Sequence, residues 1–600
     1  MKTVRIGCAS AFWGDTNSAA AQLVEKGNID YLVFDYLAEI TMSILAAKRM
    51  RDINDGFASD FVQHVMAPLL PQIAEQGIKV VSNAGGVNPL ACKQALEKAA
   101  QDAGLALKVA VVLGDDLLPR RKEFAELSEW ETGAALPKTL LSMNAYLGAL
   151  PIRDALAAGA DVVITGRCVD SAVVLGPLMH EHGWGERDYD RLAQGSLAGH
   201  IIECGAQCTG GNFTDWELAR AGYADMGFPV VEVEESGDFV VSKPPQTGGL
   251  VSVGTVGEQM LYEIGDPRRY ILPDVVCDFT AVKLEQIDTD QVRVSGARGA
   301  APTPMYKVSA TYPAGFRSNA TFMIGGRDAA AKGRAVAEAI IARTRRLFDA
   351  QGFDDYLAVD IDVLGAESTY GRHARDGALA TREVVVKISV QHANNKALGL
   401  FAREIAPAAT GMAPGMTGYF GGRPSPSPVV RLFSCLVPKT ALEVTVQLGG
   451  NAAQVCEIPA GEPLSDLPVE DSPSVTVPEP QTRVALIKLA WARSGDKGDH
   501  ANIGVMARKP DYLPYLRNAL TAEAVRDYFS EQLAAPAADA AVQRWELPGS
   551  HSFNFLLRNA LGGGGVASVR TDPQGKCFGQ MLLDFRVPVP PELADRLAAD

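Results

Sequence analysis

Several short apolar runs in the first third of the chain lead directly into polar residues that could bind a ligand or move a proton. Carboxylates suit general acid–base work, and arginine or backbone N–H groups can hold an anion. Taken one at a time, most of these residues can be explained as turn formers or helix caps. Arg167 and Glu39 cannot, because they are poor turn formers. We therefore expect a shared site. Its candidates are Asp35, Glu39 and Asp170 as catalytic groups, and Ser10, Asp15, Asn83, Gly85, Gly86 and Arg167 as substrate-binding groups.

A second candidate segment places His200, Cys204 and Cys208 at intervals of four residues. If one helix ran through the segment, the three would share a face, as zinc ligands can. Glycines within the segment disfavour that helix and no fourth ligand lies nearby, so we expect no metal. The segment instead offers Glu203 and Cys204 as further catalytic candidates, although a nucleophilic Cys204 would need a base close to it.

A third candidate segment, residues 493–502, combines two cations with two glycines. Glycines let backbone N–H groups turn toward an anion, and Arg493 and Lys497 add positive charge. A tight turn with solvated charges explains the glycines equally well, but it does not need both cations. We expect Arg493 and Lys497 to bind substrate, and their loop to face the carboxylate-rich site of the first third.

The elements that must position the first site alternate in type along the chain. Short β-branched runs bounded by polar residues are typical of buried parallel strands, and the segments between them have helical patterns. This predicts a mostly parallel sheet flanked by helices, in which the carboxyl ends of the strands meet at one edge. The expected strands are residues 4–8, 31–34, 78–82, 108–113 and 161–165, and the expected helices are 19–27, 60–76, 89–103 and 151–158.

The pattern changes beyond residue 228, where half-exposed strands and long loops predict an α+β extension of the same large domain, residues 1–460. Five prolines then mark a connector over residues 461–482. A small ferredoxin-like α+β domain is expected over residues 483–600. Its expected strands are 484–490, 503–507, 542–547 and 580–587, and its expected helices are 521–534 and 553–561.

Composition narrows the class of protein. The 600 residues carry a net charge of −15, which disfavours nucleic acid as a partner, because phosphate binding needs clustered positive charge. No run is long and apolar enough to span a membrane. Nine cysteines without a CxxC pair fit a reducing cytoplasm. The common nucleotide, metalloprotease and serine-hydrolase motifs are missing, so no cofactor is expected.

Five motifs of the chain are distinctive together: IGCASAFWGDT, VVSNAGGVNP, DVVITGRCVDSA, ECGAQCTGGN and ARSGDKGDHANIG. With them the chain resembles the acyclic terpene utilisation (AtuA-like) family over essentially its whole length. The resemblance implies a large N-terminal domain, a small ferredoxin-like C-terminal domain and a catabolic role alongside CoA-thioester pathways. Cys208 departs from the family's ECG-x-Q-x-TGG pattern, which weakens the metal hypothesis further.

Two classes of function remain open. The chain could be an enzyme acting on a branched acyl-CoA or related acid, as a hydratase, lyase or thioester hydrolase, with N–H groups of residues 83–86 holding the thioester oxyanion. It could instead be a non-catalytic ligand-binding or assembly subunit for an acyl-CoA pathway enzyme such as a carboxylase. In either case we expect a small-molecule ligand, a homo-oligomer and a cytoplasmic location.

Overall fold

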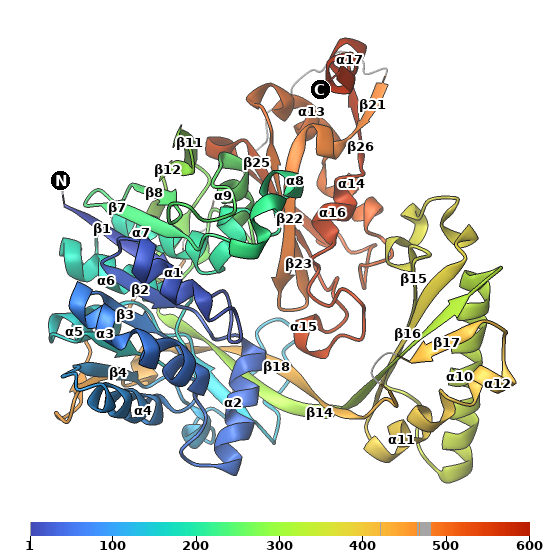
Figure 1. Cartoon of the computed structure of the whole chain (residues 1–600), viewed down its shortest axis with the longest axis horizontal. Coiled ribbons are helices and arrows are strands. Elements are labelled where there is room, and N and C mark those ends of the chain that lie inside the picture. Colours follow the sequence, from blue (N-terminus) through green and yellow to red (C-terminus); the bar gives the residue numbers. More distant parts are fainter. Residues whose placement is uncertain (1, 420–421, 465–466, 468–481, 600) are drawn as a thin grey trace.

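The computed structural model describes residues 2–419, 422–464, 467 and 482–599. A large body occupies the left of Figure 1, the C-terminal domain lies beside it, and a lobe built from residues of the third quarter of the chain lies at the lower right. Most of the expected connector, residues 461–482, lies outside the described residues. None of the described helices is long and apolar enough to cross a membrane.

Five parallel strands form the centre of the body, as the sequence predicts. They pair in the order β1-β2-β3-β6-β4, and their β-branched side chains are buried on both faces. Such continuous apolar runs are what a doubly covered parallel sheet requires. Their bounds are β1 (Thr3–Cys8), β2 (Tyr31–Phe34), β3 (Lys79–Ser82), β6 (Val162–Ile164) and β4 (Val109–Leu113).

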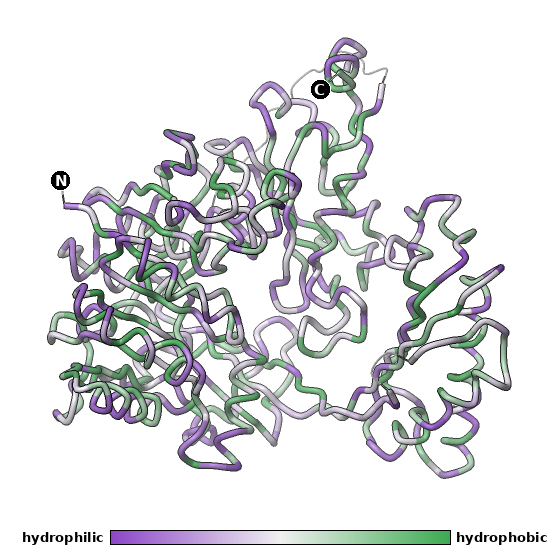
Figure 2. The backbone as a smooth tube through the Cα atoms, in the orientation of Figure 1, coloured by the Kyte–Doolittle hydropathy of each residue, from purple (hydrophilic) through white to green (hydrophobic). Residues whose placement is uncertain are grey.

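Helices cover both faces of this centre. Val80 packs into a core with one set of helices, whereas its neighbour Val81 points into the core on the opposite face. Figure 2 shows hydrophobic segments running through the inner strands. The first set of helices is α1 (Ser18–Lys26), α3 (Ala67–Gln76) and α4 (Pro89–Asp102), and the second is α5 (Leu150–Ala157), α6 (Ala172–His182) and α7 (Tyr189–Ile202).

Antiparallel strands extend the sheet on both sides to eleven strands, so the whole sheet is mixed. This makes the large domain α/β, as predicted, with the parallel pairing confined to its centre. The added strands are β7 (Val230–Glu234), β8 (Phe239–Ser242), β12 (Gln291–Ser295) and β11 (Lys283–Asp288) on one side, and β19 (Thr445–Leu448) and β20 (Gln454–Val455) on the other.

Part of the predicted α+β extension is a lobe, which the long strand β14 (Met305–Gly325) enters from the body (Figure 1). The strands β7, β8, β11 and β12, which also belong to the predicted extension, lie in the sheet of the body. The first half of β14 pairs with β18 (Ser427–Pro438) and β5 (Ser142–Ala145), and its second half pairs with β16 and β17 in the lobe. The remaining lobe elements are β15 (Ala358–Leu364), β16 (Glu383–His392), β17 (Met416–Tyr419), α10 (Ala329–Gln351), α11 (Asn395–Glu404) and α12 (Ala408–Gly411).

The small domain centres on an antiparallel sheet of order β22-β23-β25-β24. Its strands are β22 (Ala490–Lys497), β23 (His500–Ala507), β25 (Ser552–Leu557) and β24 (Val542–Leu547). A separate pair joins β21 (Thr482–Ala485) to β26 (Arg586–Val589). Helices α13 (Leu513–Ala519), α14 (Ala522–Tyr528), α15 (Gly564–Ala567), α16 (Phe578–Leu582) and α17 (Pro591–Ala599) complete the domain.

Three predictions for this domain are wrong. The expected helix over residues 553–561 is the strand β25, whose six residues are all buried. A short run that is apolar on every side fits a buried helix and a buried strand equally well. The expected strand over residues 580–587 is divided between α16 and β26. The expected strand over residues 484–490 is β21 followed by a short helical turn, and the main strand starts only at Ala490.

Candidate functional site

The carboxyl ends of the central strands bring three of the predicted residues together. The hydroxyl of Ser10, after β1, donates to the backbone carbonyl of Asp35, after β2, over 3.0 Å. The amide of Asn83, after β3, donates to the carboxylate of Asp35 and accepts from the backbone N–H of Tyr36 at 2.7 Å. All three are buried. Burial, together with the charges of Asp170 and Glu203, holds the pKa of Asp35 well above its usual range.

Arg167, after β6, lies at the centre of the candidate site and is 5% exposed. Its guanidinium lies 4.3 Å from the ring centre of Tyr146 and 3.5 Å from the carboxylate of Asp170. It also donates to the backbone carbonyl of Leu37. An arginine held on an aromatic ring between carboxylates is a fixed positive charge of the kind that anchors anions.

Glu39 is the first residue of α2 (Glu39–Arg51) and accepts a hydrogen bond from the phenol of Tyr146. The ammonium group of Lys307, on β14, lies 3.9 Å from its carboxylate. Burial raises the pKa of Glu39, but the charges of Lys307 and Arg167 and the Tyr146 hydrogen bond together bring it down to about 2. Glu39 is therefore ionised at every physiological pH.

The pKa values of Glu203 and Asp170 are shifted in the opposite direction to that of Glu39. Burial and the charge of Asp170 hold the pKa of Glu203 well above its usual range, against the charges of Lys497 and Arg167. Burial also raises the pKa of Asp170. The pKa values of the carboxylates at this end of the sheet are thus shifted in opposite directions, down for Glu39 and up for Asp35, Asp170 and Glu203. Such a division is how a protein supplies acid and base from the same side chains.

The small domain contributes Lys497, at the tip of the β22–β23 hairpin. Its ammonium group donates to the backbone carbonyl of Glu263 at 3.0 Å and lies 5.3 Å from the ring centre of Tyr270. The side chain is exposed to solvent, and partial desolvation together with the charge of Lys307 lowers the pKa of Lys497. The tip faces the carboxylates of the body, as expected, but residues 493–497 form the strand β22 rather than a loop.

Lys576, from the same domain, approaches the site beside Lys497. Its ammonium group lies 3.5 Å from the carboxylate of Glu263 and 4.4 Å from the ring centre of Tyr262. Glu263 has a φ of 56° and directs its backbone N–H to the side-chain oxygen of Asn502, on β23, at 2.7 Å. The hairpin and the body therefore fix each other's geometry at the site.

Arg493 lies in the contact between the domains, away from the ligand position that the sequence suggests. It is 4% exposed, and all three nitrogens of its guanidinium donate hydrogen bonds to the body. Nε donates to the carboxylate of Glu258 at 3.1 Å, and Nη2 lies 2.9 Å from the same carboxylate. Nη1 donates to Gln259 and to the backbone carbonyl of Gln207, and Nη2 donates to that of Gly211. No donor is left for a substrate, so the geometry gives Arg493 a structural role.

Backbone N–H groups of the turn after β3 also have protein partners. Those of Ala84, Gly85 and Gly86 donate to the hydroxyl of Ser82 and to the carbonyls of Thr165 and Asn83. They are not available to an oxyanion in this arrangement. A Cβ on Gly85 would lie 2.5 Å from the carbonyl oxygen of Thr165, so the glycine allows a close approach of two strands' ends.

The surroundings of Asp15 and Cys204, two further predicted site residues, favour structural roles for both. The carboxylate of Asp15 accepts the backbone N–H groups of Ala11 and Thr16, at 2.9 and 2.7 Å, and so closes its own turn. Burial holds the pKa of the Cys204 thiol well above its usual range, and the charge of Glu203 adds to this effect. A thiol in that environment is a poor nucleophile.

Helix α7 ends at Ile202, so His200, Cys204 and Cys208 do not share a helical face. Among the described residues, no group of three or more histidine, cysteine or acidic side chains is arranged to hold a metal ion. His200 is instead packed against the rings of Tyr270 and Phe279, with centres 5.5 and 6.3 Å away.

Sequence reasoning missed five residues of the site. Each reaches the site only through contacts with residues far away in the sequence, and none belongs to a distinctive motif. The non-glycine left-handed backbone at one of them is invisible in a sequence. They are Tyr146, Lys307, Glu263, Tyr270 and Lys576.

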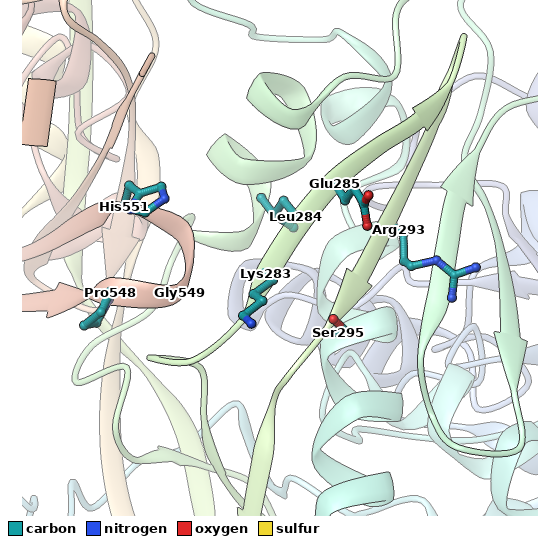
Figure 3. Close-up of a pocket in the computed structure, with 8 residues that line it drawn as sticks. All are labelled: Lys283, Leu284, Glu285, Arg293, Ser295, Pro548, Gly549 and His551. Carbon is teal, nitrogen blue, oxygen red and sulfur yellow. The ribbon is translucent and has the colours of Figure 1, made fainter. Parts of the chain in front are cut away.

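A hollow of about 440 Å³ lies elsewhere, between the β11–β12 hairpin and a turn of the small domain. Figure 3 shows Lys283 and Glu285 on one strand, Arg293 on its neighbour and His551 across from them. None of the residues around Arg167 lines this hollow. We base the candidate site on the converging charged side chains, because several of them carry perturbed pKa values.

Two family models match the chain. The model described as acyclic terpene utilisation family protein AtuA matches residues 4–448. The chain belongs to the acyclic terpene utilisation family. The model described as the AtuA ferredoxin-like domain matches residues 484–588. In this family member, Lys497 and Lys576 therefore come from the ferredoxin-like domain, and Arg167, Lys307 and the carboxylates nearest them come from the large domain. No curated protein and no solved structure shows significant similarity to the chain.

The opposite pKa shifts of Glu39 and Glu203 give opposite dependences of stability on pH. Glu39 stabilises this family member fully above its ordinary pKa of 4.5, and this stabilisation is lost as pH falls toward about 2. We expect Glu39→Gln to cost up to about 3 kcal/mol of unfolding free energy, unchanged between pH 5 and 8. Glu203 stabilises most below pH 4.5, so Glu203→Gln should become less costly as pH rises.

Denaturant unfolding of the parent and both variants at pH 5, 6, 7 and 8 measures these differences. A cost of Glu39→Gln that changes across this range would contradict the charged state assigned to Glu39. A cost of Glu203→Gln that stays constant would contradict the raised pKa of Glu203.

Proposed function

We propose that this family member is a catabolic enzyme that acts on a branched acyl-CoA thioester or a related acid. The observation that carries the proposal is the convergence of Arg167, Lys307 and Lys497 on carboxylates whose pKa values are shifted in opposite directions. Structural ion pairs alone do not require protonated and charged carboxylates side by side. The reaction class is a hydration, an elimination or a thioester hydrolysis.

Each group has a role in such a reaction. Arg167 and Lys307 supply positive charge for a carboxylate or a developing oxyanion. Asp35 and Glu203, which favour a bound proton, serve as acids. Lys497 adds further positive charge for the ligand. The side chains of Glu39, Asp170 and Lys307 remain 26%, 38% and 42% exposed, so a ligand can reach this cluster from solvent.

The sequence supports further parts of the same proposal. We place the enzyme in the cytoplasm as a homo-oligomer, with a small molecule rather than nucleic acid or a membrane as its partner. Its net charge of −15 supports the exclusion of nucleic acid.

A second candidate function is that of a non-catalytic subunit that binds a partner enzyme of an acyl-CoA pathway, such as a carboxylase. Exposed apolar residues on and just after α2 favour it. Ile40, Ile44, Met50 and Ile53 are between 44% and 78% exposed. Exposed apolar surface of this kind is typical of protein interfaces when it is contiguous.

A thermal-shift screen against CoA thioesters and their free acids, followed by product analysis of every hit, tests the enzyme proposal. We expect at least one thioester to stabilise the protein and to be consumed. Arg167→Met should abolish both effects. Binding without turnover, unaffected by Arg167→Met, would favour the non-catalytic candidate.

A further inference from the structure

His200 has one ring nitrogen whose state is fixed by its partner. The ring is 1% exposed, and Nε2 lies 3.2 Å from the backbone carbonyl oxygen of Met260. A carbonyl oxygen can only accept a hydrogen bond, so Nε2 carries a hydrogen. The neutral ring then has its lone pair on Nδ1.

Nδ1 of His200 is buried, and none of the described residues forms a well-directed hydrogen bond with it. The carboxyl oxygen Oε1 of Glu203 lies 3.3 Å away, one helical turn along the chain. Without a proton, the lone pairs of these two atoms repel each other at that distance in a dry environment. A proton on either atom removes the repulsion: on Nδ1 it gives an ion pair, and on Oε1 it gives a neutral pair.

The surroundings favour the neutral pair. The rings of Tyr270 and Phe279 pack on the imidazole, and both members of the pair are less than 10% exposed, so separating charge there is costly. Burial and the charge of Lys497 lower the pKa of His200 to about 4. The charged or titratable groups facing Glu203 are Asp35, Asp170, Glu263, Arg167, Lys497 and Tyr270, with the thiols of Cys8 and Cys204.

We infer that Glu203 carries a proton which it donates to Nδ1 of His200, and that this makes Glu203 the general acid of the site and His200 its positioning residue. Only the catalytic part of this inference rests on the proposed function, and the position of the proton does not. In the transfer, the O–H group of Glu203 turns from Nδ1 to a substrate oxygen, and its O–H bond breaks as the proton bonds to that oxygen, leaving a carboxylate. That carboxylate faces a lone pair, so it takes back a proton from water or product.

Spectroscopy of the free protein tests where the proton lies. With ¹⁵N-labelled histidine and His200→Gln for assignment, we expect Nε2 of His200 to be protonated and Nδ1 to be bare from pH 5 to 8. His392 is an internal reference, because its Nε2 faces a carbonyl at 2.9 Å and its Nδ1 accepts a backbone N–H. An imidazolium, or a proton on Nδ1 alone, would overturn the inference.

Infrared difference spectra provide a second readout. Parent minus Glu203→Gln should show the carbonyl stretch of a protonated carboxyl group at pH 7. A difference that contains only carboxylate bands would overturn the assignment. Neither experiment needs a ligand, so failure of the CoA-thioester proposal and failure of this inference are distinguishable.

Turnover of a CoA thioester found in the screen tests the roles. Glu203→Gln keeps an N–H donor for Nδ1 and should bind with a Kd within about threefold, while kcat falls by about a hundredfold or more. His200→Leu removes the acceptor of the Glu203 proton, so the basic limb of the pH–kcat profile should move to lower pH. His200→Asn, which restores an acceptor, should reverse part of that shift. An unmoved limb would leave His200 a purely structural residue.

Discussion

Replacing Arg493 by methionine should lower the free energy of unfolding by about 3–5 kcal/mol. The substitution removes every partner that the guanidinium supplies and leaves the carboxylate of Glu258, which is 1% exposed, without its counter-charge. Urea unfolding followed by tryptophan fluorescence measures the loss, since Trp491 lies on the same strand and contacts Phe213 of the body.

Two variants make this expectation specific. In the double variant Arg493→Met with Glu258→Gln, no charge is left buried, so much of the lost stability should return. Arg508 also joins the small domain to the body, through Asp215 at 2.6 Å, but both side chains are more than 20% exposed. Arg508→Met should therefore cost less. Equal costs at the two arginines would contradict the role given to burial.

Lys497→Met should weaken binding of a CoA-thioester ligand by about ten- to a hundredfold and leave the thermal midpoint of the free protein nearly unchanged. A charge-assisted contact to a ligand contributes about 1.5–3 kcal/mol, which corresponds to that range. The hydrogen bond that Lys497 makes to the carbonyl of Glu263 is at a partly exposed site, so its loss costs the free protein little. Isothermal calorimetry and a melting curve give the two quantities.

Lys509 offers a matched control for this substitution. It belongs to the same domain, is exposed and lies 5.8 Å from the ring centre of Tyr512, but it is not part of the site. Lys509→Met should leave affinity unchanged. If the Lys497→Met variant binds the CoA-thioester ligand as tightly as the parent does, Lys497 is only a solvated residue of a turn.

The centre of the fold and half of the site can be predicted from the sequence because the signals there are local. β-branched runs specify buried parallel strands, and parallel strands bring the residues at their carboxyl ends to one edge of the sheet. Ser10, Asp35, Asn83 and Arg167 meet there for this reason. Their convergence can be predicted without knowing the order of the strands.

The rest depends on contacts that no local pattern specifies. Tyr146 and Lys307 meet only because β5 pairs with β14, more than 150 residues away. Arg493 and Lys497 carry the same charge in the same motif, but Arg493 lies in the domain contact and Lys497 lies at the site. They differ because α9 (Val253–Met260) covers the middle of β22 but not its tip. In the small domain, the buried run of β25 lacks the alternation that separates a strand from a helix.

Strand β14 also has a mechanical consequence. Lys307 stands near its beginning, in the site, and Phe322 stands near its end, in the core of the lobe, so one uninterrupted strand connects the two. Its pairing with β18 shifts register between Pro313 and Phe316, where Gly315 has a φ of 91°. We therefore expect a displacement of the lobe to bend β14 near Gly315, eight residues beyond Lys307, and to leave the position of the Lys307 ammonium group little changed.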